Sequence, residues 1–167
     1  MDSPSDENSQ VTRKIPRIVC HKNAVQMTYE EDDDLLDLKE FLSQTLPIRV
    51  PPAYFSSLRQ NTVQSFCMFE EGSLVGQISW VLEKNLYHIY TLAVAAHRRG
   101  EGIGSSLLSS LLAVAHAGDA VQLHVQSGNV DAINLYHRFG FEKVETIPNF
   151  YKRMHDSTAL LLVKKIV

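Results

Sequence analysis

The order of the elements between Leu86 and Gln126 constrains the fold of this chain more than any other feature. Leu86 to Val94 is rich in aromatic and aliphatic residues and predicts a strand. Gly102 to Ala117 carries apolar residues at helical spacing, and Val121 to Gln126 predicts a second strand. A strand, a helix and a strand in this order form a crossover connection, so we expect a mixed α/β protein.

Three strands are predicted to pair at the start of the sheet. Ser65 to Phe69 and Leu74 to Leu82 precede the strand at Leu86, and the short turns Glu71-Gly72 and Lys84-Asn85 separate the three. Strands joined by such short turns are antiparallel neighbours. The sheet is therefore expected to begin as an antiparallel meander.

Two helices are predicted ahead of this meander, after a strand over Ala24 to Tyr29. The acidic run Glu30 to Asp34 places carboxylates at the positive N-terminus of the first helix, which Pro47 must interrupt. A second, short helix opens at Pro51-Pro52. The segment Leu46 to Val50 between them is expected to be an irregular loop.

The chain after the crossover predicts one more helix and two strands. Asn129 to Phe139 has an apolar face, with Asn129 as its N-cap and Gly140 as its C-cap. Glu142 to Ile147 and Thr158 to Val167 are the predicted last strands.

Length and charge limit what else the chain can be. Its 167 residues suit a single domain over residues 17–167, behind a loose polar tail over residues 1–16. A formal net charge of -3 gives no reason to expect nucleic acid or a membrane surface as a partner. Cys20 and Cys67 lie far apart with no metal-ligand spacing, so neither a disulfide nor a metal site is expected. The expected compartment is the cytoplasm, with the nucleus as an extension of it.

The segment Arg98 to Ser105 is a glycine-rich turn between a strand and a helix. Such a turn lets backbone N–H groups approach a phosphate, and the helix dipole favours its negative charge. Gly100, Gly102 and Gly104 alternate, which departs from both the dinucleotide fingerprint and the Walker A loop. The turn is therefore predicted to bind a phosphate, the alternative being a turn that only reverses the chain.

Two motifs together resemble the GNAT acyltransferase superfamily. They are Arg99-x-x-Gly102-x-Gly104 and Asn129-x-x-Ala132-x-x-Leu135-Tyr136-x-x-x-Gly140-Phe141. More narrowly, Leu123 to Gln126 and Asn149 to Arg153 are similar to segments of the San-type catalytic subunits of N-terminal acetyltransferase E (NatE). The resemblance implies the GNAT fold, a mixed, mostly antiparallel twisted sheet flanked by about four helices and splayed between its fourth and fifth strands.

The resemblance also implies acetyl-CoA as the cosubstrate, with no metal. Its pantetheine arm would contact the backbone of Leu92 and Val94, and the side chain of Asn129 would contact it as well. Its pyrophosphate would lie on the glycine-rich turn, at Arg99, Gly100, Gly102, Ile103, Gly104 and Ser105. The hydroxyl of Tyr136 would lie near the sulfur and protonate the thiolate, the alternative being a purely structural core aromatic.

Acetyl transfer to an amine needs a group that takes a proton, and histidine suits that role near neutral pH. Strand alternation predicts that His88, Tyr90, Leu92 and Val94 share one face. The resemblance implies a proton relay by a tyrosine and a histidine; the histidine matches His124, but His88 stands where the family has the tyrosine. The alternatives are a buried structural histidine for His124 and a half-buried surface residue for His88.

The resemblance assigns the acceptor to two loops. Leu46, Pro47 and Ile48 match the loop that packs on the first side chain of a peptide, and Phe150 and Tyr151 match the hairpin that closes over its backbone. Tyr90 stands where the family has methionine, so the expected acceptor pocket differs from that of the family. An apolar wall favours a peptide that begins with Met, followed by a hydrophobic or other residue.

The leading hypothesis is therefore an N-terminal acetyltransferase that works by direct attack in a ternary complex. An α-amino group, with an ordinary pKa of about 7.7 to 8.0, needs less help from a base than lysine at about 10.4. The alternatives are an acetyltransferase for internal lysines or small amines, and a silent partner module. The resemblance further suggests a ribosome-associated NatA-type acetyltransferase complex as a partner.

Overall fold

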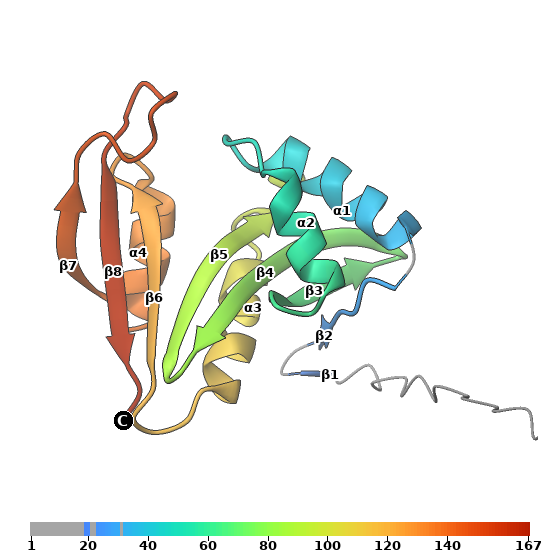
Figure 1. Cartoon of the computed structure of the whole chain (residues 1–167), viewed down its shortest axis with the longest axis horizontal. Coiled ribbons are helices and arrows are strands. Elements are labelled where there is room, and N and C mark those ends of the chain that lie inside the picture. Colours follow the sequence, from blue (N-terminus) through green and yellow to red (C-terminus); the bar gives the residue numbers. More distant parts are fainter. Residues whose placement is uncertain (1–18, 21–22, 31) are drawn as a thin grey trace, which may run out of the picture.

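The computed structural model describes residues 19–20, 23–30 and 32–167, so the predicted tail over residues 1–16 lies outside the described residues. One sheet runs through the molecule in the order β1-β2-β3-β4-β5-β6-β8-β7 (Figure 1). Its strands are β1 (Val19–Cys20), β2 (Ala24–Gln26), β3 (Gln64–Glu70), β4 (Ser73–Glu83), β5 (Leu86–Val94), β6 (Ala120–Gln126), β7 (Glu142–Ile147) and β8 (Ala159–Lys165). The helices are α1 (Asp32–Thr45), α2 (Pro52–Arg59), α3 (Ile103–Val114) and α4 (Val130–Arg138), with a 3-10 turn η2 (Ala96–Arg98) before α3.

The predicted meander and crossover are both confirmed. Strands β3, β4 and β5 pair antiparallel, and the tight turns have positive φ at Glu71, Gly72 and Lys84. Strands β5 and β6, which precede and follow α3 in the sequence, pair in parallel. The mixed sheet with four α-helices in the described residues is the predicted fold.

Two strands are shorter than predicted. Strand β2 ends at Gln26 rather than Tyr29, because its ladder to β3 covers only Val25 and Gln26 before the chain turns toward α1. Strand β8 covers Ala159–Lys165 rather than Thr158 to Val167, because β6 offers partners only for these residues.

The helix boundaries follow the capping signals. Pro52 occupies the first turn of α2, where a missing N–H costs no hydrogen bond. The side chain of Asn129 caps α4 by accepting a hydrogen bond from the Ala132 N–H. Phe139 takes the C-cap position that was predicted for Gly140, and Gly140 follows it with φ 82°, as is typical of a helix-ending glycine.

The sheet has a core on each face. Helix α3 buries Leu107, Leu108 and Leu111 against one face, where Tyr136 of α4 also packs. Helices α1 and α2 cover the other face of β3–β5 with a second core, which includes Leu38 and Leu58. Figure 1 shows α1 and α2 in front of β4 and β5, and α3 behind them. No helix in the described part of the chain is long and apolar enough to cross a membrane.

Strands β5 and β6 separate part of the way along their length (Figure 1). Their ladder runs from the pair Leu86 and Ala120 to the pair Ile89 and Leu123, and it stops there. Counted from β2, these are the fourth and fifth strands, so the predicted splay is confirmed. The diverging ends leave backbone groups of β5 without a partner strand on that side.

A β-bulge at Tyr90 overturns the predicted alternation along β5. Ile89 pairs with Trp80 while Thr91 pairs with Ser79, so Tyr90 is an extra residue in the ladder. Ile89 packs in the core of α3, whereas the Thr91 hydroxyl lies on the α2 face, 3.3 Å from the Tyr54 hydroxyl. Leu92 and Val94 therefore pack toward α3, on the face opposite His88, and do not share its face as predicted.

Candidate active site

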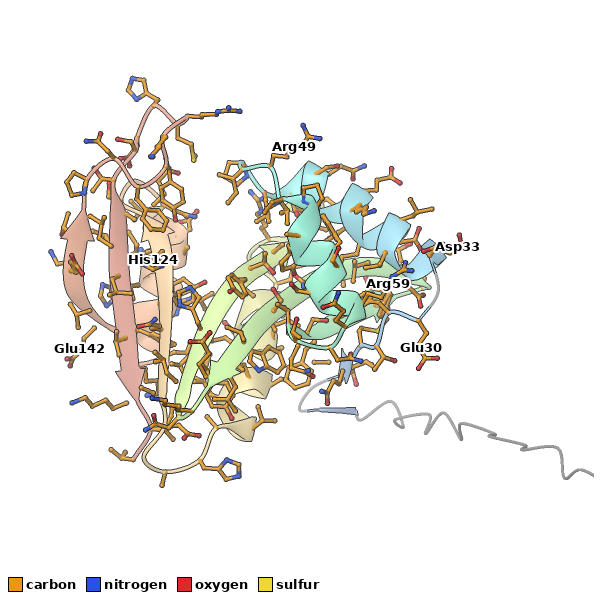
Figure 2. All side chains as sticks on the ribbon, viewed as in Figure 1. Glu30, Asp33, Arg49, Arg59, His124 and Glu142 are labelled. Atoms are coloured by element: carbon orange, nitrogen blue, oxygen red, sulfur yellow. The ribbon has the colours of Figure 1, made fainter. Side chains whose placement is uncertain are left out.

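His88 and His124 meet at the point where β5 and β6 separate. Gln122 is the Cα partner of His88, and His124 follows Leu123, the last residue of β6 that pairs with β5. The two imidazole rings lie 5.5 Å apart, centroid to centroid, at an interplanar angle of 44°. Figure 2 shows His124 on β6 beside the opening toward β5. The structure thus brings together the two histidines that were predicted to move the proton.

His88 is held by a neighbour on β6. The Gln122 side-chain nitrogen lies 3.0 Å from Nδ1 of the imidazole. Partial burial lowers the pKa of His88 below its ordinary value, nearby His124 lowers it further, and the carboxylate of Glu83 opposes them. His88 is therefore neutral at pH 7.

His124 lies against an aromatic ring rather than a hydrogen-bonding group. The Phe150 ring stacks on it at 4.5 Å and 18°. Burial lowers the pKa of His124, with Glu145 acting in the opposite direction. Among the described residues its ring nitrogens have no hydrogen-bond partner. A neutral imidazole with a free nitrogen can take up a proton.

The glycine-rich turn has the backbone geometry of an anion site. Gly100 and Gly102 have φ of 81° and 85°, a conformation that favours glycine. Helix α3 begins at Ile103 with no side-chain cap and no acidic residue in its first turn. Its first N–H groups therefore have no partner within the helix and can donate to a phosphate.

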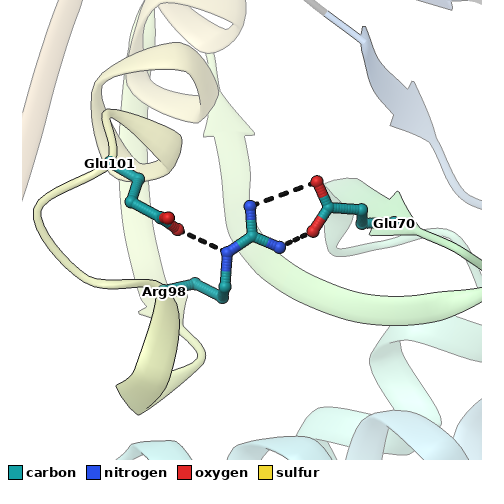
Figure 3. A network of polar contacts seen from close by, with 3 residues as sticks. All are labelled: Glu70, Arg98 and Glu101. Carbon is teal, nitrogen blue, oxygen red and sulfur yellow. Dashed lines mark hydrogen bonds and ion pairs between the residues drawn. The ribbon is translucent and has the colours of Figure 1, made fainter.

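The two arginines of this turn have different partners. The guanidinium of Arg98 pairs with the carboxylates of Glu70 and Glu101 (Figure 3). Arg99 instead donates one hydrogen bond to the carbonyl oxygen of Thr45, at 3.2 Å. Arg98 thus ties the turn to β3, and Arg99 keeps donors for an anion.

The backbone of Leu92 and Val94 faces the splay. The Ala95 N–H donates to the Val75 carbonyl of β4 at 2.9 Å. Backbone groups of neighbouring residues in a strand point to opposite sides, so those of Leu92 and Val94 point away from β4. Because β6 has already diverged there, the backbone groups of both residues can hydrogen-bond an extended ligand that takes the place of a neighbouring strand.

Asn129 is the N-cap of α4, and Tyr136 lies on that helix. The Oδ1 atom of Asn129 accepts from the Ala132 N–H at 3.2 Å, which leaves the amide nitrogen as a donor. Burial raises the pKa of Tyr136 well above its ordinary value, and nearby Tyr151 adds to this shift. The Tyr136 hydroxyl therefore stays protonated at every physiological pH.

The predicted acceptor loops lie at the same end of the sheet. Figure 1 shows the α1–α2 loop and the β7–β8 hairpin on either side of the diverging strands. Exposed apolar side chains of this region are Ile48, Tyr90 and Phe150, exposed by 41%, 54% and 42%. The Tyr90 ring lies 5.3 Å from that of His88, so the bulge residue adjoins the histidines.

Leu46, Pro47 and Ile48 also line a hollow of about 630 Å³ beside α1 and α2. Its other lining residues are Lys39, Leu42, Ser43, Arg49, Val50, Pro52 and Phe55. Neither histidine is among them. This hollow therefore does not connect the acceptor loop with His124.

No cluster of three or more possible metal ligands occurs in the described residues.

Two residues of the site were not predicted from the sequence. Gln122 lies on the same face of β6 as His124, two positions earlier, and this spacing was the one available signal. Asp156 accepts from the Ser127 hydroxyl at 2.8 Å and from the Gly128 N–H at 2.7 Å. It ties the β7–β8 hairpin to the loop that leads into α4.

The sequence matches one protein family over most of its length. Residues 27–141 match the model of the acetyltransferase (GNAT) family. The chain is 40% identical to N-alpha-acetyltransferase 50 of Danio rerio over 87 residues, which are 50% of this chain and 51% of that protein. It is 36% identical to the probable N-acetyltransferase san of Drosophila melanogaster over 87 residues, 50% of this chain and 47% of that one. The chain spans about half the length of these curated relatives.

The fold also matches solved structures. One is Arabidopsis thaliana Naa50 in complex with the bisubstrate analogue CoA-Ac-MVNAL, with a TM-score of 0.75 and 29% sequence identity. The match covers 86% of this chain and 99% of that chain.

Proposed function

The chain belongs to the acetyltransferase (GNAT) family, and we propose that it transfers the acetyl group of acetyl-CoA to the free α-amino group of proteins. One observation carries the proposal: a neutral histidine with a free ring nitrogen, His124, lies at the opening between two splayed strands. The Arabidopsis relative in complex with a bisubstrate analogue supports it.

The chain offers contacts for the pyrophosphate and the pantetheine arm of acetyl-CoA. The free N–H groups at the start of α3, together with Arg99, suit the pyrophosphate. The outward backbone of Leu92 and Val94 suits the amides of the pantetheine arm. Asn129 at the start of α4 and Tyr136 on α4 are further candidates for contacts to that arm.

The proposed reaction is a direct attack. The α-ammonium group gives one proton to His124, the amine nitrogen forms a bond to the acetyl carbon, and the carbon–sulfur bond breaks as the nitrogen loses its second proton, which replaces the one that Tyr136 gives up. The departing thiolate then takes a proton, and the protonated Tyr136 hydroxyl is the proposed donor. An α-amino acceptor, with an ordinary pKa of about 7.7 to 8.0, needs less help from a histidine base than a lysine side chain at about 10.4.

The proposed acceptor is a peptide that begins with Met. Tyr90 and Phe150 present apolar surface beside the histidines, Ile48 is exposed on the α1–α2 loop, and burial of a first apolar side chain against such surface is favourable. Lysine chains and polyamines would be attracted by free acidic groups, but the two acceptor loops carry Arg49, Lys152 and Arg153, and the carboxylate of Asp156 accepts hydrogen bonds from Ser127 and Gly128.

An acetylation assay with three acceptors tests the proposal. They are a Met-Leu peptide, the same peptide with a blocked N-terminus and an internal lysine, and spermidine, each with wild type and His124→Ala. Mass spectrometry should place the acetyl group on the free N-terminus, and His124→Ala should abolish most of the transfer. Transfer only to lysine or spermidine contradicts the acceptor, and binding of acetyl-CoA without any transfer contradicts the enzyme.

A further inference from the structure

The two histidines of the site differ in what holds them. Nδ1 of His88 lies 3.0 Å from the Gln122 amide nitrogen, whereas His124 has an aromatic ring on one face. We propose that Gln122 is a positioning residue that fixes the hydrogen of His88 on Nε2, so that His88 donates a hydrogen bond during transfer and His124 takes the proton. The proposal rests on the function proposed above.

The chemistry of the two side chains decides which nitrogen of His88 carries the hydrogen. An amide nitrogen carries two hydrogens and can only donate, so Nδ1 must accept. A neutral imidazole has a single N–H group, which is then on Nε2. His88 in this form has no free lone pair, so it cannot act as the base while Gln122 holds it.

The backbone keeps this pair in place. His88 and Gln122 are Cα partners within the parallel ladder, one pair before it ends at Ile89 and Leu123. The contact therefore lies where β5 and β6 are still paired. The ring centroids of His88 and His124 are 5.5 Å apart, at the point where the strands begin to separate.

The charged and titratable groups around His88 favour the neutral imidazole. Glu83 at the end of β4, Tyr90 on β5 and His124 on β6 surround it, and Glu145 of β7 acts on His124. Burial disfavours the imidazolium, and a second charge beside His124 would be repelled. Two neutral imidazoles can lie 5.5 Å apart without repulsion, so His88 can donate a hydrogen bond while His124 accepts the proton.

The variant Gln122→Glu reverses the hydrogen bond without removing it. A carboxylate can only accept, so Nδ1 carries the hydrogen and neutral His88 loses its donor at Nε2. Turnover at pH 8 should fall about tenfold, the worth of one hydrogen bond. At lower pH the ring is protonated and both nitrogens donate again, so the deficit should shrink. Equal or higher activity of this variant at pH 8 would overturn the proposal.

Two controls separate this effect from structural damage. Gln64→Glu makes the same change on β3, which β4 separates from the histidine strands β5 and β6, and should leave kcat and its pH dependence unchanged. His88→Tyr and His88→Phe differ by one hydroxyl, which donates but takes no proton at neutral pH. The tyrosine variant should be the more active by about tenfold, and equal rates would contradict a donor role.

The hydrogen itself can be located without an assay. ¹⁵N NMR of the histidine rings should give His88 a pyrrole-like Nε2 and a pyridine-like Nδ1 in wild type, and the opposite in Gln122→Glu. A pyrrole-like Nδ1 in wild type would overturn the proposal. If the enzyme acetylates no N-terminus, the function proposed above fails while this measurement still decides the role of Gln122.

Discussion

The turn that opens α3 and the histidine pair at the splay are built in different ways. The turn consists of consecutive residues, and its donors are backbone N–H groups positioned by Gly100 and Gly102. The histidines come from two strands, and their environment depends on side chains such as Gln122 and Phe150. A backbone site is sensitive to conformation, whereas a side-chain site is sensitive to the identity of each residue.

The largest effect is expected from His124→Ala. Loss of a general base lowers turnover by about 10² to 10⁴-fold, and the coenzyme half of the site should be untouched. Steady-state kinetics should show the fall in kcat, and calorimetry should show unchanged binding of acetyl-CoA. The matched control is His116→Ala, since His116 is 88% exposed and lies away from the site. Weaker coenzyme binding in His124→Ala would show that the two halves are not separate.

The next effect concerns backbone conformation in the turn. Gly102 has φ 85° and open space around it, so Gly102→Val adds backbone strain without a clash. The dissociation constant for acetyl-CoA should rise about tenfold or more, because strain of about 1 to 3 kcal/mol displaces the N–H groups. Calorimetric titration measures it.

Gly118→Val is the matched control for this prediction. Gly118 has φ 94° and equally open surroundings, but lies between α3 and β6. This variant should lower the melting temperature and leave the dissociation constant unchanged. Equal weakening of binding by both variants would mean that the turn matters only for stability.

A smaller effect is expected from the two arginines. Arg99→Ala should weaken acetyl-CoA binding about three- to tenfold and reduce its salt dependence, because its guanidinium has only one partner in the described residues. Arg98→Ala should instead lower the melting temperature, because Arg98 holds Glu70 and Glu101 (Figure 3). The opposite ranking of the two dissociation constants would assign the phosphate to Arg98.

The smallest effect is a shift in the pH profile. The pKa of His124 is lowered from 6.5, so its neutral form prevails at pH 7 and kcat/KM should fall as the pH drops through that pKa. Glu145 raises this pKa, so Glu145→Gln should lower it and move the acidic limb to lower pH by a few tenths of a unit. A limb that moves to higher pH would show that another group controls it.

The sequence predicted the elements of the site but not the faces on which they lie. Local signals were sufficient for the crossover, for the Asn129 cap and for the turn over residues 99–105, since each depends on neighbouring residues. The bulge at Tyr90 was missed because it is a mismatch between β5 and β4, and no property of Tyr90 alone requires it. One extra residue reversed the faces of Leu92 and Val94.

The sequence by itself determined where the strands, helices and glycine-rich turn lie, because propensity, capping and glycine conformation act over a few residues. Only the tertiary structure decided which groups meet: Gln122 beside His88, Phe150 on His124, and Asp156 on the loop before α4. Such contacts follow from strand register and splay, which arise when distant segments pack into one sheet.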